Sequence, residues 1–269
     1  MPEGHTIHRY ARSHTADLAG RTIAVSSPQG RFTEGARLLD GRRLDEIEAV
    51  GKHLFYRWDD GHVLHVHLGL FGKFRTHRSN GGPPPEPTEG TRLALRTDDL
   101  TVYLAGPTAC DLITPDEEDA IVARLGPDPL RPRASFDRFS EAVARRKTSI
   151  GAVLLDQSVI AGIGNVYRSE VPFLAGIDPR RPANAVDPHE RRLLWDLTGQ
   201  ELRRGLKSGR IVTVDPADVG LTRRSQLRNH NRVYVYKRHG EPCHRCQTPI
   251  QRVVLANRKA WWCPSCQPG

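Results

Sequence analysis

The first three residues of the chain, Met-Pro-Glu, bring together two groups that could do covalent chemistry. Once the initiator methionine is removed, Pro2 carries a secondary amine directly beside the carboxyl group of Glu3. An α-amino group has a pKa near ~8, so a useful fraction is unprotonated and nucleophilic at neutral pH, unlike a lysine side chain near ~10.4. The pair could therefore supply a nucleophile and an acid, although a leading Pro-Glu alone establishes neither role.

Four of the five cysteines form a second chemical group near the end of the chain. They make two C-x-x-C pairs separated by 16 residues, namely Cys243 with Cys246 and Cys263 with Cys266. In a reducing compartment such pairs indicate metal ligands before disulfides, and four thiolates with no open position are typical of a structural zinc site. The alternative is two unrelated thiol pairs. Cys110 stands alone, and we expect it to be a buried small apolar residue.

The net charge of +9 is unevenly distributed. Residues 131–269 hold 25 Lys and Arg against 12 Asp and Glu, a surplus of 13 positive charges, whereas residues 1–130 hold 15 against 19. A basic surface is suited to phosphate, because cationic side chains release counterions from nucleic acid. A high arginine content without nucleic-acid binding is the competing explanation. No apolar run could span a bilayer and no secretory signal pattern is present, so we expect a cytoplasmic, nucleoid-associated protein without a membrane partner.

The first half of the chain must position Pro2 and Glu3. Residues 6–20 have helical spacing of apolar side chains and end at a glycine. Two alternating apolar runs flank Asp59-Asp60-Gly61, and two more flank Asp98-Asp99, which predicts two β-hairpins. Residues 80–90 are rich in proline and glycine and predict a loop. The pattern predicts an antiparallel β-sandwich behind one leading helix.

The second half reads as helical, after a stiff proline-rich connection. Ser135 and Asp187 are placed to cap helices over 135–146 and 187–206. Between them, Ser149 is expected to cap a short helix, two glycines in "SVIAGIGN" to break it, and Asn165 to open the next. Backbone N–H groups in such a glycine turn can bind an anion, although a glycine turn is also an ordinary helix corner. A metal-fixed hairpin with Arg258 at its tip could contact phosphate or bind protein.

Several of these stretches resemble one known family. "LLDQSVIAGIGNVYRSE" is similar to the helix-two-turn-helix of the formamidopyrimidine-DNA glycosylase/endonuclease VIII family, and "HGEPCHRC…NRKAWWCPSCQ" resembles its C-terminal zinc finger. "MPEG" resembles the family's N-terminus, "VGKHL" its catalytic-lysine strand, and "LGPDPL" its inter-domain junction. The matches keep the family order over essentially the whole chain, which makes the combination far more specific than any one motif.

The resemblance implies a bifunctional glycosylase and lyase that acts on damaged double- or single-stranded DNA in base excision repair. It implies that Pro2 attacks C1′ of the damaged nucleotide and forms a Schiff base, and that Glu3 is the general acid. By the same resemblance Lys52 supports β-elimination and Arg258 supports δ-elimination and phosphate binding. The remaining DNA-contacting positions that it implies are Asn165, His67, Arg124, Leu70 and Phe71. It further implies one structural zinc ion, no catalytic metal, and a monomer.

The chain also departs from the family pattern. His5 and Thr6 stand where many members continue Pro-Glu, so a second carboxylate is absent. "HLGLFG" and "LAGPTACDL" lack the methionine, arginine and phenylalanine of the purine-lesion branch. Leu70 and Phe71 instead resemble the Leu-Tyr wedge of endonuclease VIII, although Gly69 stands where that branch carries glutamine. Two apolar side chains could fill the space that a flipped base leaves. The resemblance to the endonuclease VIII branch implies oxidised pyrimidines as substrates. Packing of both residues inside the sheet is the alternative.

We therefore expect an α+β protein with an N-terminal catalytic β-sandwich domain (1–124) and an inter-domain linker (125–134). A helix-two-turn-helix domain (135–231) and a four-cysteine zinc-finger hairpin (232–269) complete the chain. A purine-lesion glycosylase of the same family is the first alternative. A non-catalytic zinc-finger protein that binds nucleic acid is the second, and it gives the N-terminal amine and carboxyl no purpose.

Overall fold

The computed structural model describes residues 2–79 and 82–269 and divides the chain into two compact units. The N-terminal unit comprises the residues up to Glu3 together with Ile7–Arg124, and the C-terminal unit comprises Gly4–Thr6 together with Leu125–Gly269. The residues expected to form a linker, 125–134, thus lie in the C-terminal unit. No helix among the described residues is long and apolar enough to cross a membrane.

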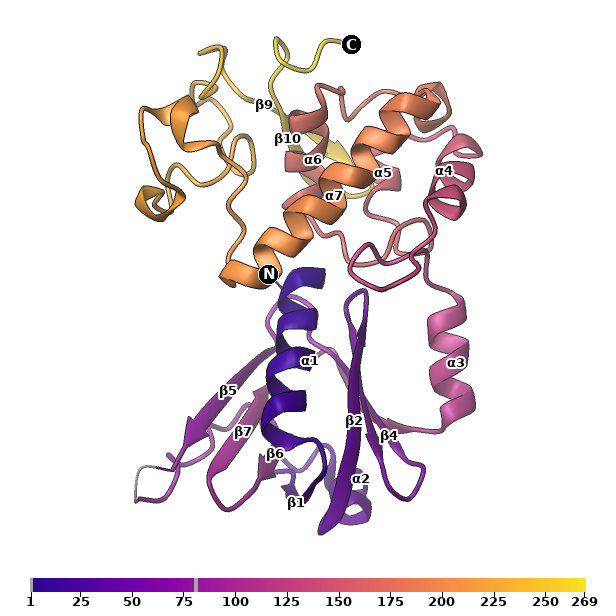
Figure 1. The fold of residues 1–269 in the computed structure, drawn as a ribbon, viewed down its shortest axis with the longest axis vertical. Helices are drawn as coiled ribbons and strands as arrows, with labels where there is room; N and C mark the ends of the chain where they lie inside the picture. Colours follow the sequence, from indigo (N-terminus) through magenta and orange to yellow (C-terminus); the bar gives the residue numbers. More distant parts are fainter. Residues whose placement is uncertain (1, 80–81) are drawn as a thin grey trace. The chain divides into compact units, whose positions relative to one another are not determined.

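The N-terminal unit is built from one long helix and an eight-stranded antiparallel sheet (Figure 1). The sheet order is β5-β7-β6-β1-β2-β3-β4-β8. The leading helix is α1 (Gly4–Leu18), and the strands are β1 (Arg21–Ser26), β2 (Arg42–Val50), β3 (His53–Trp58), β4 (Val63–His67), β5 (Lys73–Arg78), β6 (Thr91–Arg96), β7 (Leu100–Ala105) and β8 (Ala109–Ile113).

Strand β1 joins the two halves of the sheet. Its first residues, Arg21–Ile23, pair with β2, whereas its last residues, Ala24–Ser26, pair with β6. The two halves share one core with α1, in which Ile7 and Leu18 of the helix pack with Leu54 of one half and Leu104 of the other. The predicted antiparallel sandwich with a leading helix is therefore confirmed. Because β1 pairs with both halves, it allows them to pack face to face.

Both predicted hairpins are present. Strands β3 and β4 pair across the turn at residues 59–62, where Gly61 has a φ of +84° and its N–H donates to the carbonyl of Trp58 at 3.0 Å. Strands β6 and β7 pair across Asp98-Asp99. Residues 82–90 contain no helix or strand, as expected, while Asn80 and Gly81 of that predicted loop lie outside the described residues.

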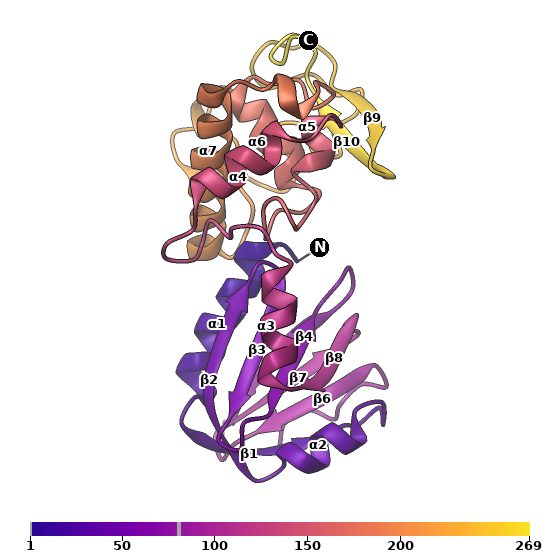
Figure 2. The same cartoon turned by 90° about the vertical axis from the view of Figure 1, so that its right-hand side faces the viewer.

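Two short helices complete this unit. Helix α3 (Pro115–Ala123) covers the outer face of β3 and β4, where Glu118 accepts hydrogen bonds from Arg57 of β3 (Figure 2). Helix α2 (Thr33–Leu39) was not anticipated from the sequence pattern. It has only seven residues and no side-chain cap, so burial of Ala36 and Leu39 stabilises it where propensity alone would not.

The C-terminal unit contains four α-helices and a hairpin in its described residues. The predicted caps are confirmed, since Ser135 accepts from the N–H of Arg138 and Asp187 forms a capping box with Glu190. Helices α6 and α7 pack against each other, and Phe139, Leu154, Tyr167 and Leu194 belong to their shared core. The elements are α4 (Phe136–Ala144), α5 (Ile150–Val153), α6 (Tyr167–Ala175), α7 (Pro188–Ser208), β9 (Gln251–Leu255), β10 (Arg258–Trp262) and the 3₁₀ turns η1 (Ala183–Ala185), η2 (Pro216–Val219) and η3 (Arg224–Gln226).

The helix-turn element differs in detail from the prediction. Helix α5 is one turn long, and the Ser149 side chain makes no capping hydrogen bond. After the helix, Asp156 accepts from the backbone N–H and the hydroxyl of Ser158. Helix α6 begins at Tyr167 rather than at Asn165. The Asn165 side chain does not cap this helix, and its amide N–H donates to the carbonyl of Lys259.

Candidate active site and metal centre

The Pro2-Glu3 pair lies directly before helix α1. Glu3 is the N-cap residue, with extended backbone angles, and its carbonyl accepts from the N–H of Ile7 at 3.3 Å. Its side chain makes no capping hydrogen bond, although a glutamate in this place could do so. Glu3 is 0% exposed, which is rare for a glutamate. Local helix formation therefore does not explain why a carboxyl group is buried beside the half-buried Pro2.

Gly4 and His5 belong to the C-terminal unit and contact other residues of that unit. The N–H of Gly4 donates to the carbonyl of Gly162 at 2.8 Å, and a side chain at Gly4 would lie 2.9 Å from the Gly162 Cα. His5 is buried edge-on against Tyr167, with ring centroids 5.4 Å apart. A Cβ at Gly205 would lie 2.8 Å from the His5 ring. A side chain is therefore excluded at Gly4 by the backbone of Gly162, and at Gly205 by the His5 ring.

Lys52, His67 and Arg124 all lie near His53 in the N-terminal unit. Lys52 is in the tight turn between β2 and β3, beside Gly51 with a φ of +59°. His67 is the cross-strand partner of His53, with ring centroids 4.9 Å apart. Arg124 is the exposed C-cap residue of α3, and its charge and that of Lys52 both act on the pKa of His53. The structure therefore gathers three of the residues named from the sequence.

His67 has a lowered pKa in this setting. Burial is the main cause, and the positive charge of Lys52 adds to it. The imidazole is therefore neutral at physiological pH in the unliganded protein. A neutral ring can donate one hydrogen bond to a phosphate, and an arriving anion would favour its charged form.

Leu70 and Phe71 protrude from the loop between β4 and β5. Their side chains are 49% and 84% exposed, so neither packs in the sheet. Two glycines make this loop tight. Gly69 has a φ of +62° and a Cβ there would lie 1.8 Å from Thr108 Oγ1, while a Cβ at Gly72 would lie 2.3 Å from the carbonyl oxygen of Leu68. A glutamine in place of Gly69 would require this loop to move.

Asn165 and the hairpin that carries Arg258 meet in the C-terminal unit. The Asn165 amide donates to the carbonyl of Lys259 at 3.1 Å, and its buried Oδ1 has no hydrogen-bond partner among the described residues. Ala256 and Asn257 both have positive φ, which gives the two-residue turn between β9 and β10. The Arg258 side chain after this turn is exposed. The turn therefore presents a guanidinium to solvent beside a partly unsatisfied amide.

Arg168 is a positioning residue that the sequence pattern did not reveal. It is 0% exposed, and its guanidinium donates to the carbonyls of Leu255, Arg258 and Lys259 in the hairpin and of Gly151 in α5. An arginine shortly before the apolar run 171–175 is the signal that could have indicated it, since such a charge is buried only when partners satisfy it. Helix α6 thus holds the hairpin through one side chain.

The four C-terminal cysteines converge as predicted. Their sulfur atoms all lie within 4.8 Å of one another, with 3.8 Å between Cys243 and Cys266 and 3.4 Å between Cys246 and Cys263. A tetrahedral ion with metal–sulfur bonds of about 2.3 Å holds its ligands about 3.8 Å apart, so the donor set fits a four-coordinate structural metal. Gln267 supports the site, because its Oε1 accepts from the N–H of Cys263 and its amide donates to the carbonyl of Ile177.

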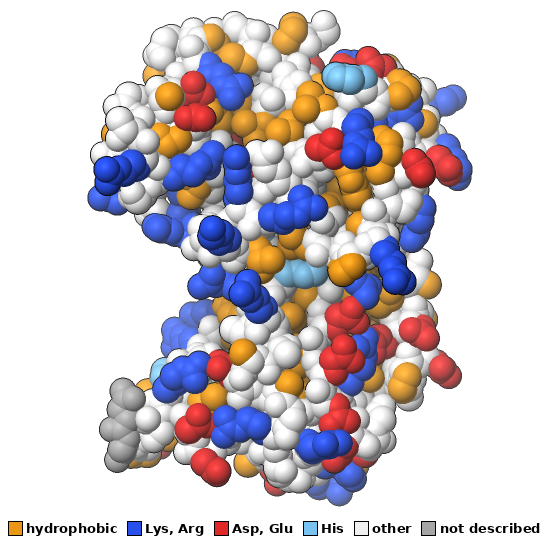
Figure 3. Space-filling model, viewed as in Figure 1, with side chains coloured by type: hydrophobic (Ala, Val, Ile, Leu, Met, Phe, Trp, Pro, Cys, Tyr) orange, Lys and Arg blue, Asp and Glu red, His pale blue; other side chains and the backbone are white. Residues whose placement is uncertain are grey.

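A basic surface lies on the C-terminal unit. Figure 3 shows Lys and Arg side chains spread over this unit on the face that it draws. The second half of α7 and the segment that follows it contribute exposed cations, which are Arg203, Arg204, Lys207, Arg210, Arg223, Arg224 and Arg228. These side chains carry part of the positive surplus of residues 131–269, and their exposure offers phosphate contacts beyond the site residues predicted from the sequence.

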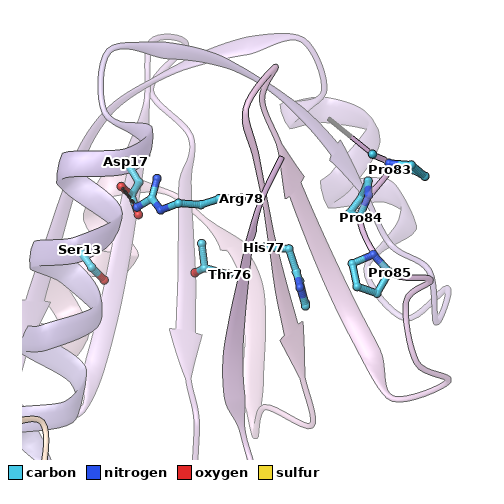
Figure 4. Close-up of a pocket in the computed structure, with 9 residues that line it drawn as sticks. Ser13, Asp17, Thr76, His77, Arg78, Pro83, Pro84 and Pro85 are labelled. Atoms are coloured by element: carbon cyan, nitrogen blue, oxygen red, sulfur yellow. Dashed lines mark hydrogen bonds and ion pairs between the residues drawn. The ribbon is translucent and has the colours of Figure 1, made fainter. Parts of the chain in front are cut away.

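A large pocket of the N-terminal unit lies elsewhere. It has a volume of about 790 Å³ and opens between α1, β5 and the proline loop at 83–85, as Figure 4 shows. Arg78 and Asp17 form an ion pair of 2.7 Å in its wall. None of the residues that line it is a site residue predicted from the sequence, so cavity size does not identify the reactive centre here.

Comparison with known proteins agrees with this geometry. Residues 1–107 match the formamidopyrimidine-DNA glycosylase N-terminal domain, residues 125–216 match the H2TH domain of the same enzymes, and residues 240–269 match the zinc finger found in FPG and IleRS. The chain is 44% identical to endonuclease 8 1 of Mycobacterium bovis over 99% of its own length and 100% of that protein. It is 32% identical to the formamidopyrimidine-DNA glycosylase of Thermus thermophilus, over 99% of this chain and 97% of that one.

Solved structures lead to the same family. Lactococcus lactis Fpg in complex with DNA that contains an abasic site superposes with a TM-score of 0.81 at 25% identity, covering 99% of this chain and 100% of that one. The MutM (Fpg) protein of Thermus thermophilus superposes with a TM-score of 0.79 at 30% identity, covering 99% and 98%. With all three sequence segments matched in order, the chain belongs to the formamidopyrimidine-DNA glycosylase/endonuclease VIII family of DNA glycosylases.

Proposed function

We propose that this protein is a bifunctional DNA glycosylase and AP lyase that excises oxidised bases, preferably pyrimidines, from damaged DNA. The observation that carries the proposal is the pair at the N-terminus, where a potential amine nucleophile at Pro2 precedes a completely buried Glu3. A protein that only binds nucleic acid has no use for such a pair. Membership in a family of DNA glycosylases supports the same conclusion.

The proposed reaction begins at Pro2. Its nitrogen attacks C1′ of the damaged nucleotide while Glu3 donates a proton to the sugar ring oxygen, the base departs, and a Schiff base links sugar and protein. The iminium withdraws electrons from C2′, so a proton can leave and the 3′ phosphate is eliminated. Lys52 assists this β-elimination, and Arg258 binds phosphate and assists the δ-elimination that follows.

The remaining proposed roles concern DNA binding. His67, Arg124 and Asn165 contact phosphates, and the position of His67 and Arg124 around Lys52 supports this assignment. Leu70 and Phe71 fill the space of the flipped nucleotide, which the exposure of both side chains supports. The four cysteines bind zinc, because tetrahedral thiolate sites of this spacing are typical of that metal.

Two features favour the pyrimidine branch over the purine branch. The relative with 44% identity is named an endonuclease 8. In addition, residues 106–108, which join β7 to β8, supply neither an arginine nor an aromatic side chain, and Cys110 after them is buried in β8. The protruding Leu70 and Phe71 are therefore the side chains available on this unit to act as a wedge.

Borohydride trapping on DNA with an abasic site tests the reaction. The mature protein should form a covalent adduct, whereas protein that retains Met1 should not, because Pro2 then lacks a free amine. Failure of the mature protein to form the adduct would refute the lyase activity and leave the non-catalytic alternative. For the substrate, duplexes with 5-hydroxyuracil or thymine glycol should be cleaved faster than 8-oxoguanine opposite cytosine. The reverse order would assign the protein to the purine branch.

A further inference from the structure

Two histidines outside the proposed reaction form a hydrogen-bonded pair near Lys52, His67 and Arg124. His53 Nδ1 lies 2.8 Å from His65 Nε2, and the two rings are stacked with centroids 5.1 Å apart and an interplanar angle of 17°. Phe55 stacks near both rings at angles of 9° and 21°. The pair is on the same face of β3 as Arg57, whose side chain bonds α3. It is therefore a built, ordered pair rather than two adjacent surface side chains.

The geometry limits how many protons the pair can carry. One of the two facing nitrogens must donate and the other must accept, so one hydrogen lies between them. In the neutral pair, one of the two outer nitrogens carries the second N–H and the other is unprotonated. The unprotonated outer nitrogen can accept one proton while the hydrogen bond between the rings is kept. A second added proton would place two N–H groups against each other and break it. The pair is thus suited to exchange a single proton.

Lys52, Arg124 and His67 lie near the pair, and His67 is neutral in the protein without DNA. Burial lowers the pKa of His53 to about 3, and electrostatic interactions with His67, His65, Lys52 and Arg124 add to this effect. His65 has Asp111 of β8 as its cross-strand partner. Burial lowers the pKa of His65 to about 4, with Asp111 opposing and His67 adding to this effect. In the protein without DNA, the pair is therefore neutral.

We propose that the His53–His65 pair takes up one proton when a DNA phosphate binds at Lys52, His67 and Arg124, which couples DNA affinity to pH. This inference rests on the proposed function, since it needs a phosphate at these three side chains. The phosphate offsets the positive charges of Lys52 and Arg124, which add to the effect of burial on His53, so the charged form of the pair becomes more favourable than in the protein without DNA. The proton comes from solvent and no bond to DNA is made by the pair.

Linkage makes the proposal measurable. If binding takes up one proton, the pair has a higher pKa in the DNA complex than in the unbound protein. Between these two pKa values, the affinity for DNA rises roughly tenfold for each unit by which the pH falls. The probe is a duplex with a tetrahydrofuran abasic analogue, which cannot undergo the lyase reaction. Calorimetric titration at pH 6 in buffers of different ionisation enthalpy, at constant salt, gives the number of protons taken up.

The decisive comparison uses the double variant His53→Phe/His65→Phe, which keeps aromatic rings in the stack. It should bind the duplex with a smaller proton uptake, leaving only what His67 contributes, and its affinity should depend less on pH. His77→Phe on β5 is the matched control and should retain the wild-type uptake. His65→Phe alone provides the test should the double variant not fold, and it should also lower the uptake.

Two results would overturn the inference. The first is binding of the duplex by the wild type without proton uptake, and the second is an uptake in the folded pair variants equal to that of the wild type. Trapping on abasic DNA separates this failure from failure of the proposed function. Trapping with no proton linkage removes the inference alone, whereas absence of both trapping and duplex binding removes the two together.

Discussion

The guanidinium of Arg168 donates to the backbone carbonyl of Arg258 at 2.9 Å. A fully buried side chain in helix α6 therefore fixes the backbone from which the exposed Arg258 side chain extends. The same guanidinium bonds the carbonyls of Leu255 and Lys259. One residue therefore holds both ends of the turn. This arrangement explains how a short hairpin can present Arg258 in a constant position.

Replacing Arg168 should disconnect the hairpin from helix α6. Arg168→Met leaves buried carbonyls unsatisfied and should lower the free energy of unfolding by about 2–4 kcal/mol, with weaker binding of abasic DNA. Urea denaturation and anisotropy with a labelled duplex measure the two effects. The control Arg192→Met removes an exposed ion pair with Asp196 and should cost under about 1 kcal/mol. Equal stability of the two variants would contradict this role of Arg168.

Removing the metal should unfold the end of the C-terminal unit. Cys243 and Cys263 belong to a small core with Trp261, so loss of the ion should expose the tryptophan and change its fluorescence. Chelation should release one metal per chain and abolish DNA binding. Cys246→Ser should lower the metal content, whereas Cys110→Ser, in the other unit, should keep it at one. A folded, active protein with an empty four-cysteine site would refute a structural metal.

Stability should fall in mild acid because of His14. This buried ring lies 2.7 Å from the Tyr56 hydroxyl, and burial lowers its pKa to about 4, with Asp17 opposing. The neutral ring is favoured in the folded state, so the stabilisation is complete above the unfolded pKa of about 6.5 and is lost as the pH falls toward 4. Linkage gives a loss of about 2 kcal/mol by pH 5.

His14→Gln should remove this part of the pH dependence, since an amide can still bond the Tyr56 hydroxyl but does not titrate. Denaturation at pH 8 and pH 5 should show a smaller difference than in the wild type. His53 and His65 act in the same direction, so some dependence remains. An unchanged difference between the two pH values would exclude His14 as a source.

Gly205 should tolerate a side chain less well when His5 is present than when it is absent. Gly205→Ala would place a Cβ 2.4 Å from the Tyr167 hydroxyl and 2.8 Å from the His5 ring, and should cost roughly 1–3 kcal/mol. Because Gly4–Thr6 follows Pro2 and Glu3, the rate of borohydride trapping should fall more than DNA affinity does. In the His5→Ala background the same substitution should cost less stability. Strict additivity of the two stability changes in this double-mutant cycle would contradict a clash between the new Cβ and the His5 ring.

Phe71 should matter for excision and not for folding. Its side chain is 84% exposed, so Phe71→Ala should change the free energy of unfolding by under about 0.5 kcal/mol. Loss of one stacking contact, worth about 1–3 kcal/mol, should slow excision from duplex DNA by roughly tenfold or more. Leu193→Ala, which truncates a partly exposed leucine on α7, serves as the comparison. Equal excision rates for wild type and Phe71→Ala would argue against a wedge.

Much of the fold was predictable because local patterns determine it. The turn at Gly61 requires a positive φ, and the caps Ser135 and Asp187 satisfy helix N–H groups that have no other partner. The C-x-x-C spacing specifies a metal site in the same local way. Helix α2 escaped prediction because it is short and depends on burial. The Asn165 side chain, expected at the start of α6, instead bonds a residue 94 positions away, which no local pattern indicates.

The sequence by itself determined which groups could react and which could bind metal, because the amine of Pro2, the carboxyl of Glu3 and the four thiols are properties of residue type and position in the chain. Tertiary structure alone decided that Glu3 is fully buried, that Arg168 holds the hairpin and that His53 bonds His65. These are contacts between residues distant in sequence, and their energies depend on burial and charge at the place where the chain brings them together.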